Sequence, residues 1–233
     1  MTIGEIIQRV ESLYSKGAPS DDARLSQRHI YNKLLSVRGK LIFQKSNKNQ
    51  KISIWNYQTL PCIELVKAPL HECPCLPPSG CQILRSKHPL PKPLLNLSTH
   101  LIDNVTSLDG AIIYSETDWE GYKYKKGNKY TKKKLDYFVR NGYIYITHKD
   151  GPKIISLTGL FEDPIEADKF PSYCDKEDCK DCQDCDSILD KEFPVDGDLI
   201  DLLVEFTVAE LVNVFGQLRQ DTDNDSKDNI QDN

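Results

Sequence analysis

Residues 138–147 read Phe-Val-Arg-Asn-Gly-Tyr-Ile-Tyr-Ile-Thr and contain the clearest structural signal in the chain. Asn141 and Gly142 both tolerate the positive φ that a two-residue type I′ turn requires, and apolar or aromatic residues flank them on each side. This pattern predicts a β-hairpin in the middle of the chain. Further strands are expected at residues 52–57, 111–115, 122–130 and 154–160, the third as a hairpin that turns near Gly127-Asn128.

Helices are expected at both ends of the chain. Thr2 and Glu5 have the spacing of a capping box, in which each side chain satisfies the other residue's backbone N–H. A second amphipathic helix is expected to open at Ser20 and to run to about Gln44. The most apolar segment, residues 196–220, predicts a final helix. The sequence therefore predicts an α+β protein in which terminal helices form a helical core with an inserted antiparallel β domain.

The expected domain boundaries follow changes in composition along the chain. Most of the thirteen prolines lie in one central stretch, where they remove backbone donors and favour an extended arm. The last residues are rich in aspartate and have one isoleucine, so they cannot offset their own ordering entropy. The expected parts are an N-terminal helical hairpin (1–48), an inserted β domain (49–170) with a proline- and cysteine-rich extended arm (61–93), an acidic cysteine-rich loop (171–195), a C-terminal helix packed on the N-terminal helices (196–220) and a disordered acidic tail (221–233).

The overall composition indicates a protein with partners. Hydrophobic residues make up 39% of the 233 residues and charged residues 28%, which is leaner and more charged than an average globular domain. The chain begins without a cationic and apolar leader and contains no run near the ~18 apolar residues of a membrane span. Neither export nor membrane insertion is expected, so the eight cysteines are expected to be thiols rather than disulfides.

The cysteines are the main candidates for a metal site. Four of them fall within twelve residues and could form a tetrahedral thiolate zinc site, although zinc sites more often use two well-separated pairs. Structural or incidental thiols are the favoured alternative, and a disulfide is the third. These residues are Cys174, Cys179, Cys182 and Cys185. A second group is open to metal ligation or, as the stronger reading, to packing of small buried side chains; it comprises Cys62, His71, Cys73, Cys75 and Cys81.

A lysine-rich stretch is the second unusual feature. Seven lysines lie between Lys123 and Lys134, interleaved with tyrosines. Lysine and tyrosine together suit phosphate and base contacts, as in a nucleic-acid-binding module. Lysines on a solvated hairpin tip also prevent an exposed strand edge from pairing with other chains, which is the favoured interpretation. A third use is pairing with an acidic partner, such as the aspartate-rich tail of another copy.

The sequence contains no recognisable catalytic motif. It has no Gly-rich phosphate loop, no His-Glu-x-x-His and no nucleophile elbow. The five histidines show no spacing to a carboxylate or nucleophile that would suggest acid–base catalysis. The prediction is a non-enzymatic protein that works by holding other proteins, without a resident cofactor unless the cysteines bind structural zinc.

Several segments are distinctive in combination. They are Asp22–Lys33, Cys62–Leu65, Glu72–Cys75, Ile83–Lys87, Pro89–Pro91 and Glu192–Pro194. Together they resemble a virion structural protein of crAss-like bacteriophages, and they span most of the chain from the first helix to the last. The proline- and cysteine-rich run in the middle is the most specific part of this resemblance.

The resemblance implies a head-to-tail connector, or adaptor, subunit in the neck or tail of the virion, present in the host cytoplasm during assembly. The implied partners are the portal protein, other tail or ring proteins and further copies of the chain in a twelvefold ring. DNA would pass through the lumen without sequence-specific contacts, and no membrane partner is implied. The alternatives are another ring of the tail barrel and, outside this family, a zinc-bearing nucleic-acid-binding module.

Overall fold

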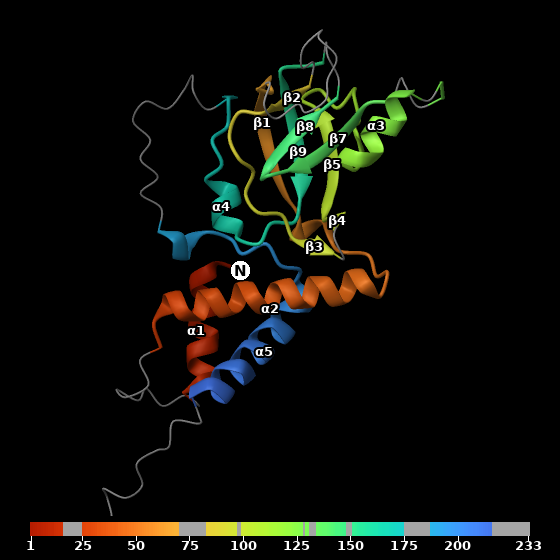
Figure 1. Ribbon diagram of the computed structural model, residues 1–233. Helices are drawn as coiled ribbons and strands as arrows, with labels where there is room; N and C mark the ends of the chain where they lie inside the picture. Colours follow the sequence, from red (N-terminus) through yellow and green to blue (C-terminus); the bar gives the residue numbers. More distant parts are fainter. Residues whose placement is uncertain are drawn as a thin grey trace, which may run out of the picture. The chain divides into compact units, whose positions relative to one another are not determined.

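The computed structural model describes residues 1–15, 25–69, 83–96, 99–127, 129–130, 134–147, 151–174 and 187–215 (Figure 1). The chain forms two compact units. The first comprises residues 1–41 and 187–233, and the second comprises residues 42–186. The protein is α+β, as the sequence predicts.

The first unit begins with helix α1 (Ile3–Tyr14). The Thr2 side chain accepts a hydrogen bond from the Glu5 backbone N–H (3.2 Å), and the Glu5 carboxylate accepts one from the Thr2 backbone N–H (2.9 Å). This reciprocal pair confirms the predicted capping box. The helix buries four apolar side chains along one face, namely Ile3, Ile6, Ile7 and Val10.

Two longer helices contribute to the first unit, the first of them only through its residues up to Leu41. Helix α2 (Gln27–Asn47) starts later than the sequence predicts, because Leu25 and Ser26 are not helical and the Ser26 hydroxyl accepts from the His29 backbone N–H (3.2 Å). The predicted opening at Ser20 lies outside the described residues. Helix α5 (Gly197–Phe215) confirms the predicted final helix and packs against α1. A short 3₁₀ turn, η4 (Ile188–Asp190), also contacts α1.

The second unit is built on a seven-stranded sheet with strand order β5-β9-β1-β2-β8-β7-β6. Figure 1 labels the strands of this sheet except β6. Every neighbouring pair is antiparallel except β6–β7, which is parallel, so the sheet is mixed where an antiparallel one is predicted. The strands are β1 (Gln58–Lys67), β2 (Leu84–Ser86), β5 (Ile102–Ser107), β6 (Ser115–Glu116), β7 (Asp136–Arg140), β8 (Tyr143–Ile146) and β9 (Ile154–Gly159). A separate pair joins β3 (Leu95–Asn96) to β4 (Thr99–His100), and α4 (Pro164–Asp168) contacts β1.

The central hairpin forms as predicted. Strands β7 and β8 pair with Arg140 opposite Tyr143, and the two residues between them have positive φ, 52° at Asn141 and 77° at Gly142. Positive φ at both positions is the requirement that selects Asn-Gly for such a turn. The predicted strand at residues 154–160 is also confirmed, as β9.

Three local predictions are wrong. Residues 52–57 contain a 3₁₀ turn, η1 (Ile54–Asn56), and the strand begins only at Gln58. Residues 111–115 are mostly irregular, with an isolated bridge at Ile113. The expected hairpin at 122–130 is instead helix α3 (Trp119–Gly127). Trp119 and Tyr122, one helical turn apart, both pack against Phe138 in tilted ring contacts, and this aromatic packing favours the helix over the strand.

The proline-rich region is only partly an arm. Residues 61–67 belong to β1 and residues 84–86 to β2, so both ends of the expected arm are built into the sheet. Pro61 fits because the β1–β9 register shifts between Leu60 and Ile63, and a bulge tolerates a missing N–H. Residues 70–82 of the arm and residues 216–233, with the acidic tail, lie outside the described part. Within the described ranges, no helix combines the length and apolar character that crossing a bilayer requires.

Candidate assembly surfaces

Helix α5 has two apolar sides. One side is buried in the first unit and includes Leu203 and Leu211, with the Thr207 hydroxyl satisfied by donating to the Leu203 carbonyl (2.7 Å). The other side, here called the α5 apolar face, is exposed; its members are Leu202, Phe206 and Val212. An ordinary surface helix is polar on its outer side, so an outward apolar face marks a contact surface.

Ion pairs hold α5 against the other helices of the first unit. Arg9 of α1 pairs with Asp201 at 2.7 Å. Lys33 and Lys40 of α2 both pair with Glu210, the first at 3.5 Å. The hydrogen bond from Lys40 is the main cause that lowers the pKa of Glu210; burial opposes it, and the charge of Lys40 and the hydrogen bond and charge of Lys33 lower the pKa further. These contacts lie on the sides of α5 that face α1 and α2.

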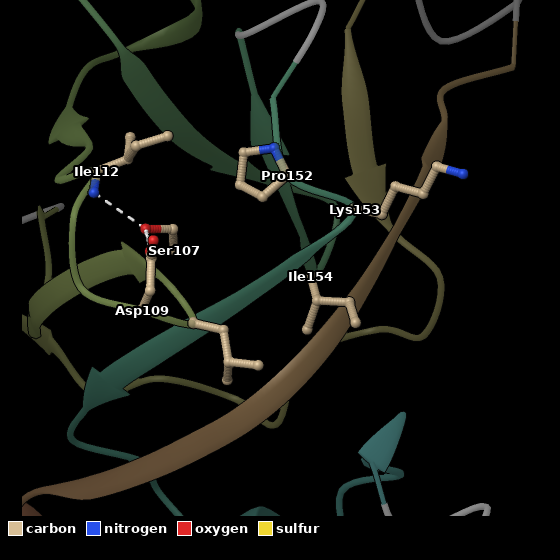
Figure 2. A pocket seen from close by; sticks show the side chains of 7 residues that line it. Ser107, Asp109, Ile112, Pro152, Lys153 and Ile154 are labelled. Carbon is tan, nitrogen blue, oxygen red and sulfur yellow. Dashed lines mark hydrogen bonds between the residues drawn. The ribbon is translucent and has the colours of Figure 1, made fainter.

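The second unit contains an open pocket at one end of the sheet, called the sheet-end pocket (Figure 2). Its volume is about 610 Å³. The turn that follows β5 and the start of β9 line it, so its two sides come from segments distant in sequence. The lining residues are Ser107, Leu108, Asp109, Ile112, Pro152, Lys153 and Ile154. The pocket is mainly apolar, with one carboxylate and one ammonium group.

Hydrogen bonds hold the rim of the sheet-end pocket in place in the isolated chain. The Ser107 hydroxyl oxygen accepts from the Ile112 backbone N–H (3.0 Å) and the hydroxyl donates to the Asp109 carboxylate. Asp109 also accepts from the Ala111 backbone N–H (3.2 Å). The Ser107 hydrogen bond is the main reason that the pKa of Asp109 is lowered, so this carboxylate is ionised at neutral pH. No sequence motif indicates this pocket.

A second, more polar pocket of about 390 Å³ lies beside α3. Its residues include two carboxylates, Glu116 and Asp118, together with His100 and Trp119. Burial raises the pKa of Glu116, and the negative charge of Asp118 raises it further, whereas burial lowers the pKa of His100. Its character is acidic and aromatic. Across the described residues, no group of three or more His, Cys, Asp and Glu side chains is placed to hold a metal ion.

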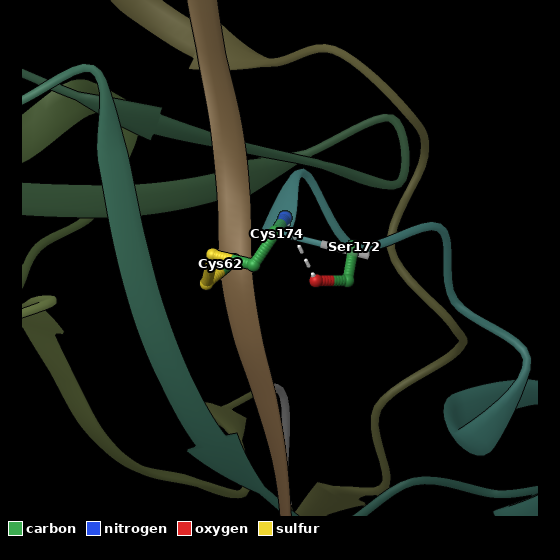
Figure 3. Close-up of a disulfide and its surroundings, with 3 residues drawn as sticks. All are labelled: Cys62, Ser172 and Cys174. Carbon is green, nitrogen blue, oxygen red and sulfur yellow. Dashed lines mark hydrogen bonds between the residues drawn. A yellow bond between two sulfur atoms is a disulfide. The ribbon is translucent and has the colours of Figure 1, made fainter. Parts of the chain in front are cut away.

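Cys62 and Cys174 form a disulfide, with their Cα atoms 5.8 Å apart (Figure 3). It joins β1 to the segment after α4, where the Tyr173 backbone N–H also donates to the Cys62 carbonyl (3.0 Å) and the Ser172 hydroxyl accepts from the Cys174 backbone N–H (3.3 Å). The expectation that cysteines stay as thiols is therefore wrong for these two. Cys62 comes from one of the two cysteine groups and Cys174 from the other. The spacing of cysteines within either group could not indicate this pairing.

The rest of the two cysteine groups lies outside the described residues. Cys179, Cys182 and Cys185 are in this position, as are His71, Cys73, Cys75 and Cys81. Cys174, the remaining residue of the candidate zinc set, is engaged in the disulfide rather than free as a thiolate. The zinc site stays a prediction.

Part of the lysine-rich stretch lies in helix α3. Lys125 pairs with the buried carboxylate of Asp136 at 3.1 Å, so this lysine stabilises the fold instead of protecting a hairpin tip. Lys129 and Lys134 are exposed. Lys132 and Lys133 fall outside the described residues, and phosphate or acidic-partner binding by the stretch stays a prediction.

Comparison with known proteins places the chain in a family. The family described as phage tail ring protein 2, of crAss phages, matches residues 5–232. A protein called ring protein 2, from Bacteroides phage crAss001, is 28% identical over 245 residues that cover all of this chain and 99% of that protein. The resemblance to crAss-like phage proteins is thereby confirmed, and the chain belongs to the phage tail ring protein 2 family.

Proposed function

We propose that this chain is a structural subunit of a ring in the tail of a crAss-like phage virion, and that it assembles with other copies of itself and with neighbouring tail components. The match to a tail ring protein family over residues 5–232 carries this proposal. A ring subunit makes and breaks no covalent bond. Its work is to bury surface against other chains, with energy from apolar contact.

The exposed apolar residues support an assembling role. The α5 apolar face in the first unit and Ile54, Trp55 and Ile113 in the second unit are open to solvent in the isolated chain. A ring of identical subunits needs two different patches on each copy, because each contact is head to tail. The chain offers apolar surface in both units, which satisfies that need.

The finer assignment is a connector at the junction of head and tail. In this role the ring docks on the portal protein, carries the next tail component and has twelve copies to match the portal. DNA passes through the lumen by contacts without sequence specificity. The resemblance to connector proteins supports this finer assignment. The match to a tail ring family is also compatible with a ring farther along the tail barrel.

The experiment measures the mass and the symmetry of the assembly. Native mass spectrometry and negative-stain microscopy of the full chain, alone and mixed with the portal protein, should give twelvefold rings and a ring–portal complex. Rings that bind another tail protein but not the portal would place the subunit farther along the tail. A chain that stays monomeric alone and with both partners, and that is missing from purified tails, would contradict the proposal.

A further inference from the structure

We infer that neighbouring copies in the ring are joined by an apolar turn of one copy, made of Ile54 and Trp55, inserted into the sheet-end pocket of the next copy. The inference rests on the proposed ring function and adds the contact that closes the ring. Both surfaces belong to the second unit and consist of described residues.

The apolar turn presents two large side chains that the isolated chain leaves exposed. Ile54 is 77% exposed and Trp55 is 72% exposed. The turn itself is well held: Asn56 is fully buried and its side-chain amide donates to the Ser53 carbonyl (3.2 Å), while the Tyr57 backbone N–H donates to the Ile54 carbonyl (3.1 Å). A rigid turn loses little entropy on docking, and tryptophan is among the residues that most often dominate interface energy.

The sheet-end pocket has the matching character. Its volume of about 610 Å³ leaves room for more than one side chain, and Leu108 is part of its apolar lining. Ile112, Pro152 and Ile154 complete this lining (Figure 2). The hydrogen bonds of Ser107 and Asp109 form its rim before any partner arrives. An open, preformed apolar depression and a rigid apolar projection are complementary surfaces for a protein contact.

The two surfaces lie at opposite ends of the same three strands. At one end, Gly159 of β9 is opposite Gln58 of β1 and Ile102 of β5, and the apolar turn is just before Gln58. At the other end, Ile155 is opposite Ser107, and the sheet-end pocket begins there. Strands of this length span roughly 15–20 Å, so a copy cannot fill its own pocket. The contact is therefore head to tail, the type that generates rings.

Charges around the two surfaces are complementary. Exposed Lys51 lies three residues before Ile54, and exposed Asp109 lies on the rim of the sheet-end pocket. Exposed Asp103, next to Ile102, is at the same end as the apolar turn, and exposed Lys153 is in the pocket. Lys51 of one copy can thus face Asp109 of the next, and Asp103 can face Lys153. Such rim charges set orientation more than affinity.

The first experiment maps the contact. Trp55 of the full chain is replaced by the photo-crosslinking residue p-benzoylphenylalanine, rings are irradiated, and linked peptides are identified by mass spectrometry. The expected product joins position 55 of one copy to residues 107–112 or 152–154 of another. Crosslinks that fall elsewhere overturn the inference.

The second experiment uses complementary variants. Trp55→Ala removes the projection and Leu108→Asp, at an exposed position, spoils the pocket; circular dichroism checks that each variant folds. Each variant should need at least tenfold higher concentration for half-assembly, whereas Tyr130→Ala, which removes another highly exposed aromatic, should assemble as the original chain does. Mixed one to one, the two variants should form heterodimers, because Trp55 of the Leu108→Asp copy still meets an intact pocket on the Trp55→Ala copy.

The outcomes separate the inference from the proposed function. Rings that form equally well with Trp55→Ala and Tyr130→Ala overturn the inference and leave the ring function standing. A one-to-one mixture of Trp55→Ala and Leu108→Asp that forms no heterodimers also overturns the inference. An unaltered chain that never assembles, alone or with tail components, overturns both.

Discussion

Arg38 and Phe193 form a buried cation–π contact in the first unit. The guanidinium carbon lies 5.9 Å from the ring centroid, and Arg38 is only 2% exposed. The Arg38 Nε also donates to the Pro194 carbonyl (3.1 Å). One side chain of α2 thus holds the segment that leads into α5.

Replacing this arginine should destabilise the first unit. Arg38→Ala removes a charge-assisted hydrogen bond and a buried contact, so the free energy of unfolding should fall by about 2–3 kcal/mol. Arg28→Ala, at an exposed position of the same helix, should change it by less than about 0.5 kcal/mol. Urea unfolding followed by circular dichroism measures both, and equal effects of the two changes would contradict the assigned role of Arg38.

The Cys62–Cys174 disulfide should stabilise the second unit strongly. It joins residues 112 positions apart, and closing a long loop restricts the unfolded chain more than closing a short one. Reduction, or the double change Cys62→Ala with Cys174→Ala, should lower the free energy of unfolding by about 2–4 kcal/mol. Thermal unfolding with and without reductant measures this, and the double variant should not respond to reductant.

A peptide map under non-reducing conditions provides the control for that prediction. It should recover Cys62 linked to Cys174. A map in which Cys174 is linked to a different cysteine, or an unaltered chain whose stability ignores reductant, would show that this bridge is not the stabilising one.

The hairpin turn should depend on glycine at its second position. Gly142 has φ of 77°, which a residue with a Cβ adopts at a cost of about 1–2 kcal/mol, so Gly142→Ala should destabilise the second unit by that amount. The cause is conformational, because an added Cβ would meet only Pro89 Cβ at 4.0 Å. Gly197→Ala, where a Cβ would meet open space, is the matched control and should cost nothing measurable in urea unfolding.

Glu210 should make the first unit sensitive to acid. Its folded-state pKa is lowered, mainly by the Lys40 hydrogen bond, so its ion pairs stabilise the fold above the ordinary glutamate pKa of about 4.3. That contribution is lost as pH falls through the lowered pKa. Glu210→Gln should cost about 0.5–1 kcal/mol at neutral pH and leave stability less dependent on pH below 4.3.

Two controls apply to the Glu210 prediction. Glu205→Gln, an exposed position of the same helix, should retain the acid dependence of the original chain. High salt should shrink the difference between Glu210→Gln and the original chain, since the pairs are partly exposed. An effect of Glu210→Gln that is the same at pH 3 and pH 7 would contradict the ion-pair explanation.

The sequence by itself determined the features that depend on residues a few positions apart. The capping box needs only Thr2 and Glu5, the hairpin turn needs only Asn141 and Gly142, and the apolar repeat of α5 lies within one segment. Each of these is a local requirement of backbone geometry or helix periodicity, so it can be recognised without knowledge of the rest of the fold. Distinctive segments along the chain also indicated the phage family, which the comparisons then established.

Only the tertiary structure decided the features that join distant residues. The stretch from Trp119 to Gly127 has a pattern compatible with strand or helix, and packing on Phe138 selected the helix. The Cys62–Cys174 bridge and the sheet-end pocket each bring together segments far apart in the chain. Strand pairing and side-chain packing determine these long-range contacts. Local residue spacing does not encode them, because the same short patterns are compatible with many long-range arrangements.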